Sequence, residues 1–237
     1  MPLRLGIIGC GLKAASYARS WTSGPVPPQI VAITDTSAAS VARYSSIVVQ
    51  SGQSAPSVYP DADAMFAAEV GTLDAVYIST PHVFHQAYAK AALKAGLHVL
   101  LEKPMTLSLA DTDALADLAR AKQVLLQPGL QERYVLDALG LPAAGRPVRL
   151  HAVRCHPPMA RNTDCSVVHD LMMHDLDTLH TLNPSPVEHL SATGRQHHTA
   201  HLDEVQARLR LDDGCEALLE ASRVADTPQR RLTLTYT

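Results

Sequence analysis

The sequence is poor in aromatic side chains, which make up 4% of its 237 residues, although hydrophobic residues reach 46%. We therefore expect a core of aliphatic side chains and alanine, in a chain long enough for one large domain or two small ones. No apolar run approaches the roughly 20 residues of a membrane span. Met1–Arg4 leads directly into a predicted strand rather than a signal peptide, so we expect a cytoplasmic protein.

Paired cysteines and an excess of basic residues are also missing. The four cysteines form no C-x-x-C pair, which favours reduced thiols and gives no support to a structural zinc site. The net charge of −3 gives no reason to expect nucleic acid or an anionic membrane surface as a partner.

The most informative stretch, Asp74–Met105, is predicted to form strand, helix and strand. The strands are Ala75–Ile78 and Leu97–Leu101. Thr80 is predicted to cap the helix between them and Pro81 to take its first position. Two strands joined through one helix are expected to be parallel, with a right-handed crossover.

Chemically useful side chains follow both of these strands. Thr80, Pro81, His82 and Lys103 fall at the carboxyl edge of the predicted sheet, where α/β proteins bind ligands. A lysine at the end of a buried strand is costly unless it faces a cleft. Lys103 is therefore a functional candidate.

A glycine motif follows the first predicted strand, Leu3–Ile8. Gly9, Gly11 and Ala14 form G-x-G-x-x-A before a helix. Gly9 permits the tight turn, Gly11 lets a pyrophosphate approach the backbone, and Ala14 allows close packing of helix on strand. The motif predicts a dinucleotide site whose phosphates lie at the helix N-terminus.

The second predicted strand, Ile30–Thr34, ends in Asp35, 24 residues after Gly11 (35 − 11), close to the spacing of the acid in dinucleotide-binding motifs. An acid at this position can bind both ribose hydroxyls of an adenosine and repels a 2′-phosphate. The simpler alternative is that Asp35 caps the next helix. We favour the cofactor interpretation, and with it NAD rather than NADP.

The pattern of elements changes after Gly129. Strands and helices alternate before it, which predicts a doubly wound parallel sheet over 1–128. A helix over 131–139, a strand over 148–154, a second helix over 167–182 and then only strands follow, which predicts a second α+β domain with an antiparallel sheet over 129–237. The strand Glu204–Leu211 alternates strictly, and its apolar face meets either a helix or a partner. We expect a homo-oligomer through the outer face of this sheet.

The helix predicted over Val167–Leu182 places Asp170, His174 and Asp177 on one stripe, at spacings i, i+4 and i+7. A carboxylate one turn from an imidazole can orient it and raise its basicity. Histidine and aspartate at this spacing can also bind zinc, but H-E-x-x-H is absent, so no metal site is predicted. The remaining alternative is a solvated polar face.

Four segments together resemble the glucose–fructose oxidoreductase / inositol dehydrogenase (Gfo/Idh/MocA) family: GIIGCGLKA, DAVYISTPHVFH, AGLHVLLEKPMTLSLADTDAL and DLMMHDLDTL. The resemblance implies a Rossmann domain joined to an open-faced antiparallel sheet, and hydride transfer between NAD(P) and a sugar or polyol. It also implies three catalytic residues: Lys103, Asp170 and His174.

Further contacts follow from the same resemblance. Cofactor contacts are expected from Gly9, Gly11, Leu12, Lys13, Asp35, Thr80, Pro81, His82, His85, Glu102 and Lys103. Members that act on nucleotide-linked amino sugars have a similar D-L-M-x-H-D helix and spaced arginines. They imply an activity like that of a UDP-N-acetylglucosamine 3-dehydrogenase, with substrate contacts from Arg133, Arg154, Arg161 and Asp177.

Two other functions compete with this one. The first is a non-catalytic sensor of NAD(H) or a sugar nucleotide, which is favoured because the chain stops at Thr237, where members of the family usually continue. The second is a reductase like biliverdin reductase, which the letters MTLSLA after Lys103 resemble. The presence of Lys103, Asp170 and His174 favours the dehydrogenase over both.

Overall fold

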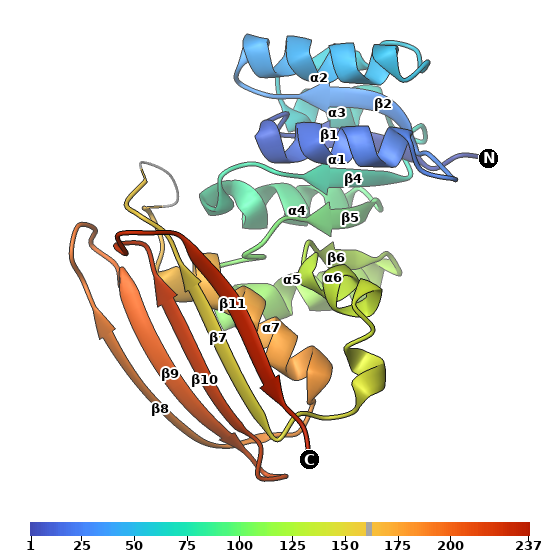
Figure 1. The fold of residues 1–237 in the computed structure, drawn as a ribbon. Coiled ribbons are helices and arrows are strands. Elements are labelled where there is room, and N and C mark those ends of the chain that lie inside the picture. Colours follow the sequence, from blue (N-terminus) through green and yellow to red (C-terminus); the bar gives the residue numbers. More distant parts are fainter. Residues whose placement is uncertain (160–162) are drawn as a thin grey trace. The chain divides into compact units, whose positions relative to one another are not determined.

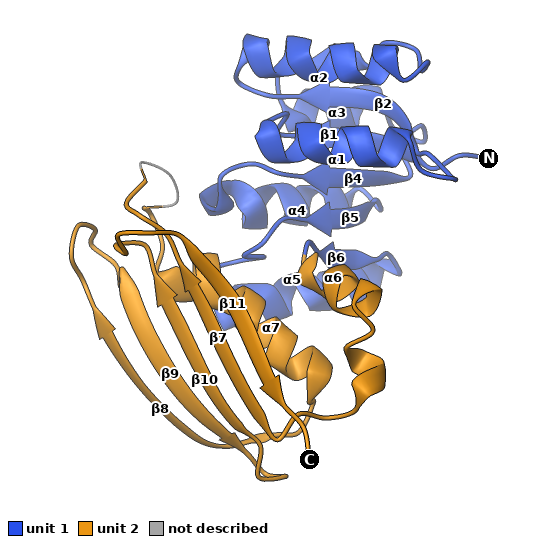
Figure 2. Ribbon diagram, in the orientation of Figure 1, with its two compact units in different colours: residues 1–129 blue, residues 130–237 orange. Residues whose placement is uncertain are grey.

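A computed structural model describes residues 1–159 and 163–237. The chain divides into two compact units, Met1–Gly129 and Leu130–Thr237, coloured separately in Figure 2. Among the described residues no helix has both the length and the apolar character needed to cross a membrane. All four cysteines lie in the described residues and are thiols.

The first unit contains a six-stranded parallel sheet in the order β3-β2-β1-β4-β5-β6 (Figure 1). This order, with its reversal between β1 and β4, is that of a dinucleotide-binding fold and confirms the doubly wound sheet. The strands are β1 Arg4–Ile8, β2 Gln29–Thr34, β3 Ser57–Tyr59, β4 Ala75–Ile78, β5 His98–Leu101 and β6 Leu126–Pro128.

Helices of the first unit bury both faces of its sheet. One core cluster joins the sheet to α1 and α2, and another joins it to α3, α4 and α5. Both consist mainly of aliphatic side chains and alanine, as the composition predicts. The helices are α1 Leu12–Thr22, α2 Ala38–Gln50, α3 Ala62–Ala68, η1 His82–Phe84, α4 His85–Lys94 and α5 Leu109–Lys122.

The cap predicted at Thr80 is wrong. Pro81 precedes the short 3₁₀ turn η1, no side chain caps that turn, and α4 begins only at His85. Pro81 has an extended ψ of 140°, so the chain leaves β4 in an extended form before it turns. The end of this helix is as predicted, because Gly96 takes a left-handed φ of 78°.

The second unit contains a five-stranded sheet within its described residues, in the order β11-β7-β10-β9-β8. The pair β7 and β10 is parallel and the other pairs are antiparallel, so the sheet is mixed rather than purely antiparallel. The elements are α6 Glu132–Ala138, η2 Pro142–Ala144, β7 Arg149–Cys155, η3 Val168–Met172, α7 Met173–Leu182, β8 Val187–Arg195, β9 Glu204–Leu211, β10 Glu216–Ser222 and β11 Gln229–Thr235.

One face of this sheet packs on helices. The apolar side chains of β9 join those of β10 and of the helical segments η3 and α7 in one buried cluster, in which Leu219 is fully buried. The alternating face of Glu204–Leu211 therefore meets a helix and not a partner. The contacting helical residues include Met172, Leu179 and Leu182.

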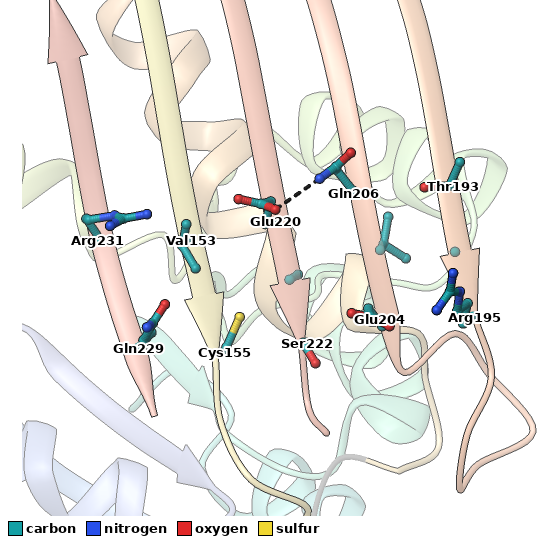
Figure 3. Close-up of a pocket in the computed structure, with 13 residues that line it drawn as sticks. Val153, Cys155, Thr193, Arg195, Glu204, Gln206, Glu220, Ser222, Gln229 and Arg231 are labelled. Atoms are coloured by element: carbon teal, nitrogen blue, oxygen red, sulfur yellow. Dashed lines mark hydrogen bonds between the residues drawn. The ribbon is translucent and has the colours of Figure 1, made fainter. Parts of the chain in front are cut away.

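The opposite face of the sheet is polar. Figure 3 shows a hollow on it, where Arg195 of β8, Glu204 of β9 and Arg231 of β11 present charges of both signs. Glu220 of β10 accepts hydrogen bonds from Gln206, at 3.0 Å, and from His151, at 2.6 Å. The bond to His151 is the main reason that the pKa of Glu220 is lowered.

A buried carboxylate fixes the connection between β8 and β9. Asp203 is fully buried and accepts hydrogen bonds from the backbone N–H groups of His197, His198 and Thr199. Arg223 lies 3.2 Å away. Burial raises the pKa of Asp203, but the hydrogen bonds outweigh it and the pKa is lowered. The connection is therefore held by a charged group with complete hydrogen bonding.

Candidate functional site

The glycine turn between β1 and α1 leaves the N-terminus of the helix open. Gly9 has a φ of 92°, and a Cβ there would lie 2.7 Å from the carbonyl oxygen of Ser79, so the fold itself requires glycine. A Cβ at Gly11 would meet nothing within 4 Å. The space beside Gly11 is thus open at the N-terminus of α1, which no side chain caps. This arrangement fits a pyrophosphate.

Asp35 follows β2 at the same edge and is joined to the turn. Its carboxylate accepts hydrogen bonds from the N–H of Cys10, at 2.6 Å, and from the N–H of Ser37, at 2.7 Å. The α2 helix is capped by Ser37, whose hydroxyl accepts from Ser40, so the alternative that Asp35 caps this helix is wrong. Burial, assisted by the charge of Asp35, raises the pKa of Cys10 to about 12.

Arg43 of α2 is hydrogen-bonded to this turn. Its Nη2 donates to the carbonyl oxygen of Cys10, at 3.2 Å, and to the Ser40 hydroxyl, at 3.4 Å. An arginine near the adenosine end of a dinucleotide site is the group that accommodates a 2′-phosphate in NADP-binding proteins. Asp35 would therefore favour NAD, whereas Arg43 would favour NADP.

The segment after β5 is anchored by a buried acid. Glu102 is 6% exposed, and its Oε1 accepts a hydrogen bond of 2.8 Å from the Tyr77 hydroxyl. Its Oε2 accepts from the N–H of Lys103, at 3.3 Å. Burial and the charge of Glu102 raise the pKa of Tyr77. Lys103, half-buried, thus starts from a backbone held at the carboxyl edge of β5.

His85 joins the loops that leave two neighbouring strands. It is 1% exposed, with Nδ1 at 2.7 Å from the carbonyl oxygen of Pro104 and Nε2 at 2.9 Å from that of Thr80. A direct bond from His85 to a cofactor would require one of these contacts to break. His82 is also buried, at the start of η1, and Pro81 is exposed beside it.

In the second unit the acid and histidine lie on an irregular helix. Val168–Met172 forms a π-helical turn that continues into α7, so Asp170 and His174 are not one regular α-helical turn apart. π-Helical turns are frequent at functional sites. Both side chains are 7% exposed, which excludes the solvated polar face as an account of them.

Asp177 is paired with Arg133 of α6. The Nε of Arg133 lies 3.0 Å from both carboxylate oxygens, and the bond to Asp177 raises the pKa of Arg133. The Arg133 side chain is 47% exposed and that of Asp177 is 8% exposed. Two residues predicted to bind substrate are therefore brought together, with the arginine reaching solvent.

Arg154 of β7 is engaged inside the second unit. Its Nη2 donates to Asp175 at 2.8 Å, its Nη1 lies 3.7 Å from Glu132, and its side chain is 14% exposed. Glu132 also pairs with Arg230 of β11. This chain of charges connects α6, β7, α7 and β11. The Arg154 fork is therefore occupied within the second unit, and Arg161 lies outside the described residues.

Several functional contacts were not predicted. The roles of Asp175 and of Tyr77 depend on partners 21 and 25 residues away. The ion pairs of Glu132 are also not predicted from the sequence, although this glutamate directly precedes Arg133, which is predicted to bind substrate. The two-sided contact of His85 has no local sequence pattern that distinguishes it from an ordinary helix N-terminal histidine.

The first unit has the strand order and the glycine turn of a dinucleotide-binding Rossmann domain, which defines the class of the fold. Comparison with known families agrees. Residues 3–130 match the oxidoreductase family with an NAD-binding Rossmann fold, and residues 143–237 match the GFO/IDH/MocA C-terminal domain. The chain belongs to the Gfo/Idh/MocA oxidoreductase family.

Its relatives are dehydrogenases and reductases of sugars and polyols. A UDP-N-acetylglucosamine 3-dehydrogenase of Acidithiobacillus ferrooxidans is 33% identical over 235 residues, which are 98% of this chain and 71% of that protein. A crystal structure of that enzyme has a TM-score of 0.83 at 30% identity and covers 100% of this chain and 75% of its own. An inositol 2-dehydrogenase of Pseudomonas syringae pv. syringae is 30% identical over 192 residues, 77% of this chain and 55% of that protein.

Proposed function

We propose that this protein is an NAD-dependent dehydrogenase that oxidises a secondary alcohol of a nucleotide sugar, with the 3-hydroxyl of UDP-N-acetylglucosamine as the leading candidate. The observation that carries the proposal is the 33% identity to a UDP-N-acetylglucosamine 3-dehydrogenase over 98% of the chain. The inositol dehydrogenase shares 30% identity over a smaller part, 77% of the chain. A nucleotide sugar is therefore favoured over a polyol.

The reaction needs a hydride acceptor, a base for the hydroxyl proton, and stabilisation of the developing alkoxide. NAD supplies the acceptor when bound. Gly9, Gly11 and the N-terminus of α1 would hold its pyrophosphate, and Asp35 its adenosine ribose. Leu12 and Lys13, in the first turn of α1, would lie beside the phosphates.

We propose that His174 takes the hydroxyl proton, because the pKa of an ordinary imidazole lies near neutrality. Asp170 would orient the ring, and both side chains are 7% exposed, as a site that excludes water requires. Lys103 would stabilise the alkoxide, since an ammonium in a water-poor cleft acts strongly on developing charge. The roles of Lys103 and His174 in this proposal can be exchanged.

The test of the function is nicotinamide absorbance at 340 nm with a panel of substrates. Reduction of NAD with UDP-N-acetylglucosamine, and much slower reduction with inositols and with N-acetylglucosamine lacking UDP, is the expected result. Faster turnover of an inositol would replace the proposed substrate class. Binding of NADH and UDP-sugars by calorimetry without any turnover would instead identify a sensor.

We predict that NADH binds about tenfold or more tightly than NADPH, because in this proposal Asp35 would place a carboxylate beside a 2′-phosphate. Like charges a few ångströms apart repel by about 1–4 kcal/mol near a protein surface. A factor of ten corresponds to about 1.4 kcal/mol. Fluorescence titration of both reduced cofactors measures the ratio.

The variant Asp35→Asn removes the charge and keeps an acceptor oxygen for only one of the N–H groups of Cys10 and Ser37, which bond different carboxylate oxygens of Asp35, and the ratio of NADPH to NADH dissociation constants is expected to fall. Asp61→Asn is a matched control, because Asp61 also accepts a backbone N–H, that of Ala64, at the start of a helix after a strand. It should leave the ratio unchanged. Tighter binding of NADPH by the unchanged protein would contradict the proposed preference for NAD.

We also propose a homo-oligomer that uses the polar outer face of the second unit's sheet. In the hollow of Figure 3, Arg231 and Arg195 lie on the outer strands and glutamates lie between them, so a second copy related by a two-fold axis could place Arg231 against Glu204. Light scattering at micromolar concentration should give a multiple of 25.5 kDa. The variant Arg231→Glu should weaken the association, whereas Arg120→Glu on α5 should not. A monomeric mass for the unchanged chain would contradict this proposal.

A further inference from the structure

The ring of His85 occupies an unusual position, because both of its nitrogens face carbonyl oxygens. Nδ1 lies 2.7 Å from the oxygen of Pro104, and Nε2 lies 2.9 Å from that of Thr80. A carbonyl oxygen only accepts hydrogen bonds, so a neutral ring donates to one of these oxygens and a protonated ring donates to both. His85 is 1% exposed, so no water competes for either contact.

The two carbonyls belong to the loops that follow paired strands. Thr80 follows β4 and Pro104 follows β5, and these strands are hydrogen-bonded neighbours. Their sequence positions are 5 and 19 residues from His85. The imidazole therefore bridges, from the first turn of α4, two loops that the sheet hydrogen bonds no longer hold together.

The loop that contains Pro104 also contains Lys103. On one side of this lysine, its own N–H donates to the buried carboxylate of Glu102 at 3.3 Å. On the other side, the carbonyl of the next residue contacts His85. The backbone that carries the lysine is thus fixed from both directions, and each fixing group is almost completely buried.

We infer that His85 is a positioning residue for Lys103: it fixes the loop after β5 against the loop after β4, and so sets where the lysine ammonium lies. This inference rests on the proposed role of Lys103 in the reaction. His85 would then act without touching the cofactor, in contrast to the direct contact predicted from the sequence. A misplacement of about 1 Å in a catalytic group is enough to slow a reaction substantially.

The surroundings of the ring shift the pKa of His85 in both directions. Burial is the main reason that the pKa of His85 is lowered, His82 lowers it further, and the two carbonyls and Glu102 raise it. Burial favours the neutral ring, whose single N–H donates to one of the two carbonyls, whereas the carbonyls and Glu102 favour the protonated ring, which donates to both. A substitution that keeps the bridge must reproduce the shape of the ring and reach both carbonyls.

Two substitutions separate these properties. His85→Phe keeps a planar ring and removes both polar contacts, whereas His85→Gln supplies donors on a single nitrogen that cannot reach both carbonyls at the spacing of the imidazole nitrogens. We expect kcat to fall about tenfold in His85→Phe and about threefold in His85→Gln. The KM for the sugar substrate and the Kd for NADH should change less than twofold in both.

The matched control is His98 of β5. Its Nδ1 accepts a hydrogen bond of 2.9 Å from the N–H of Leu125, so it also joins two segments of the same sheet, but at the opposite end of β5. His98→Phe should leave kcat unchanged, even if the midpoint of thermal unfolding falls. Equal losses of kcat in His85→Phe and His98→Phe would reduce His85 to a general structural role and overturn the inference.

A second measurement does not depend on turnover. The rate at which acetic anhydride modifies Lys103, followed by peptide mass spectrometry, reports the position and surroundings of its amine. We expect a change of at least threefold in both His85 variants, with the rates at the exposed Lys90 and Lys94 of α4 as internal references. A changed rate in a protein without turnover would support the positioning and refute only the proposed function.

Unchanged modification of Lys103 together with unchanged kcat would overturn the inference. If His85→Phe does not fold, both measurements can be made on His85→Gln, which keeps a polar side chain of similar reach.

Discussion

Replacement of Lys103 by alanine should lower turnover by about a hundredfold or more while the affinity for NADH changes little. Lys103 follows β5 at the carboxyl edge of the parallel sheet, and its backbone N–H is held by the buried carboxylate of Glu102. An ammonium in this position stabilises charge that develops on the substrate oxygen only in the transition state. The loss of a hundredfold corresponds to about 2.7 kcal/mol.

The measurement is the initial rate of NADH formation at saturating substrate, with the dissociation constant of NADH measured by fluorescence. Lys90→Ala, on the exposed side of α4, is a control for loss of a lysine in the same unit and should leave both values unchanged. Near-normal turnover of Lys103→Ala on a confirmed substrate would rule out the mechanism proposed for this lysine.

The first unit could be predicted closely from the sequence because its elements depend on local signals. Gly9 must adopt a positive φ beside Ser79, and Gly96 ends a helix with another, so both glycines mark turns that only glycine makes readily. Ser108, whose hydroxyl accepts from Asp111, caps α5 as the capping pattern predicts. The buried strands of this unit are apolar, and the middle of the sheet is the only place where they can be buried.

The start of α4 shows where local reasoning fails. Thr80 and Pro81 have the residue types of a helix cap and first turn, yet the chain stays extended through Pro81 and makes a 3₁₀ turn first. His85 then occupies the first position of the helix, where its ring contacts Thr80 and Pro104. The helix α4 therefore begins where the imidazole makes its tertiary contacts, and not where the capping preferences of Thr80 and Pro81 predict.

The second unit shows a different limit. The strict alternation of β9 correctly predicts one buried face, but strand direction depends on the order in which segments of the chain pair. β10 runs parallel to β7, with which it shares no turn, and antiparallel to β9, to which the Asp213–Gly214 hairpin joins it. The pairing of Arg154 with Asp175 is of the same kind, because charge patterns do not reveal whether an arginine faces a ligand or a carboxylate of its own chain.

His174→Ala is also expected to lower turnover by about a hundredfold or more, as loss of a general base usually does. His174 lies in the first turn of α7, 7% exposed, directly after the π-helical turn that contains Asp170. His180→Ala removes an exposed histidine from the last turn of the same helix and is the matched control. Asp170→Asn should produce a smaller loss, because it leaves the imidazole in place but removes the charge proposed to orient it.

The double variant Lys103→Ala, His174→Ala tests whether the two residues act on one step. If both contribute to a single proton transfer and the alkoxide that it leaves, the combined loss of turnover must be smaller than the product of the two separate losses. A multiplicative loss would mean that the residues act independently, which contradicts a shared role at one hydroxyl.

The dependence of kcat on pH then assigns the proton. A base must be deprotonated to act, so kcat falls as the pH drops below its pKa, and this acid limb disappears from the variant that lacks the base. Loss of the limb in His174→Ala, with its retention in Lys103→Ala, would identify His174 as the base and Lys103 as the group that stabilises the alkoxide. The reverse pattern would exchange the two roles, and a limb that persists in both variants would exclude each of them as the base.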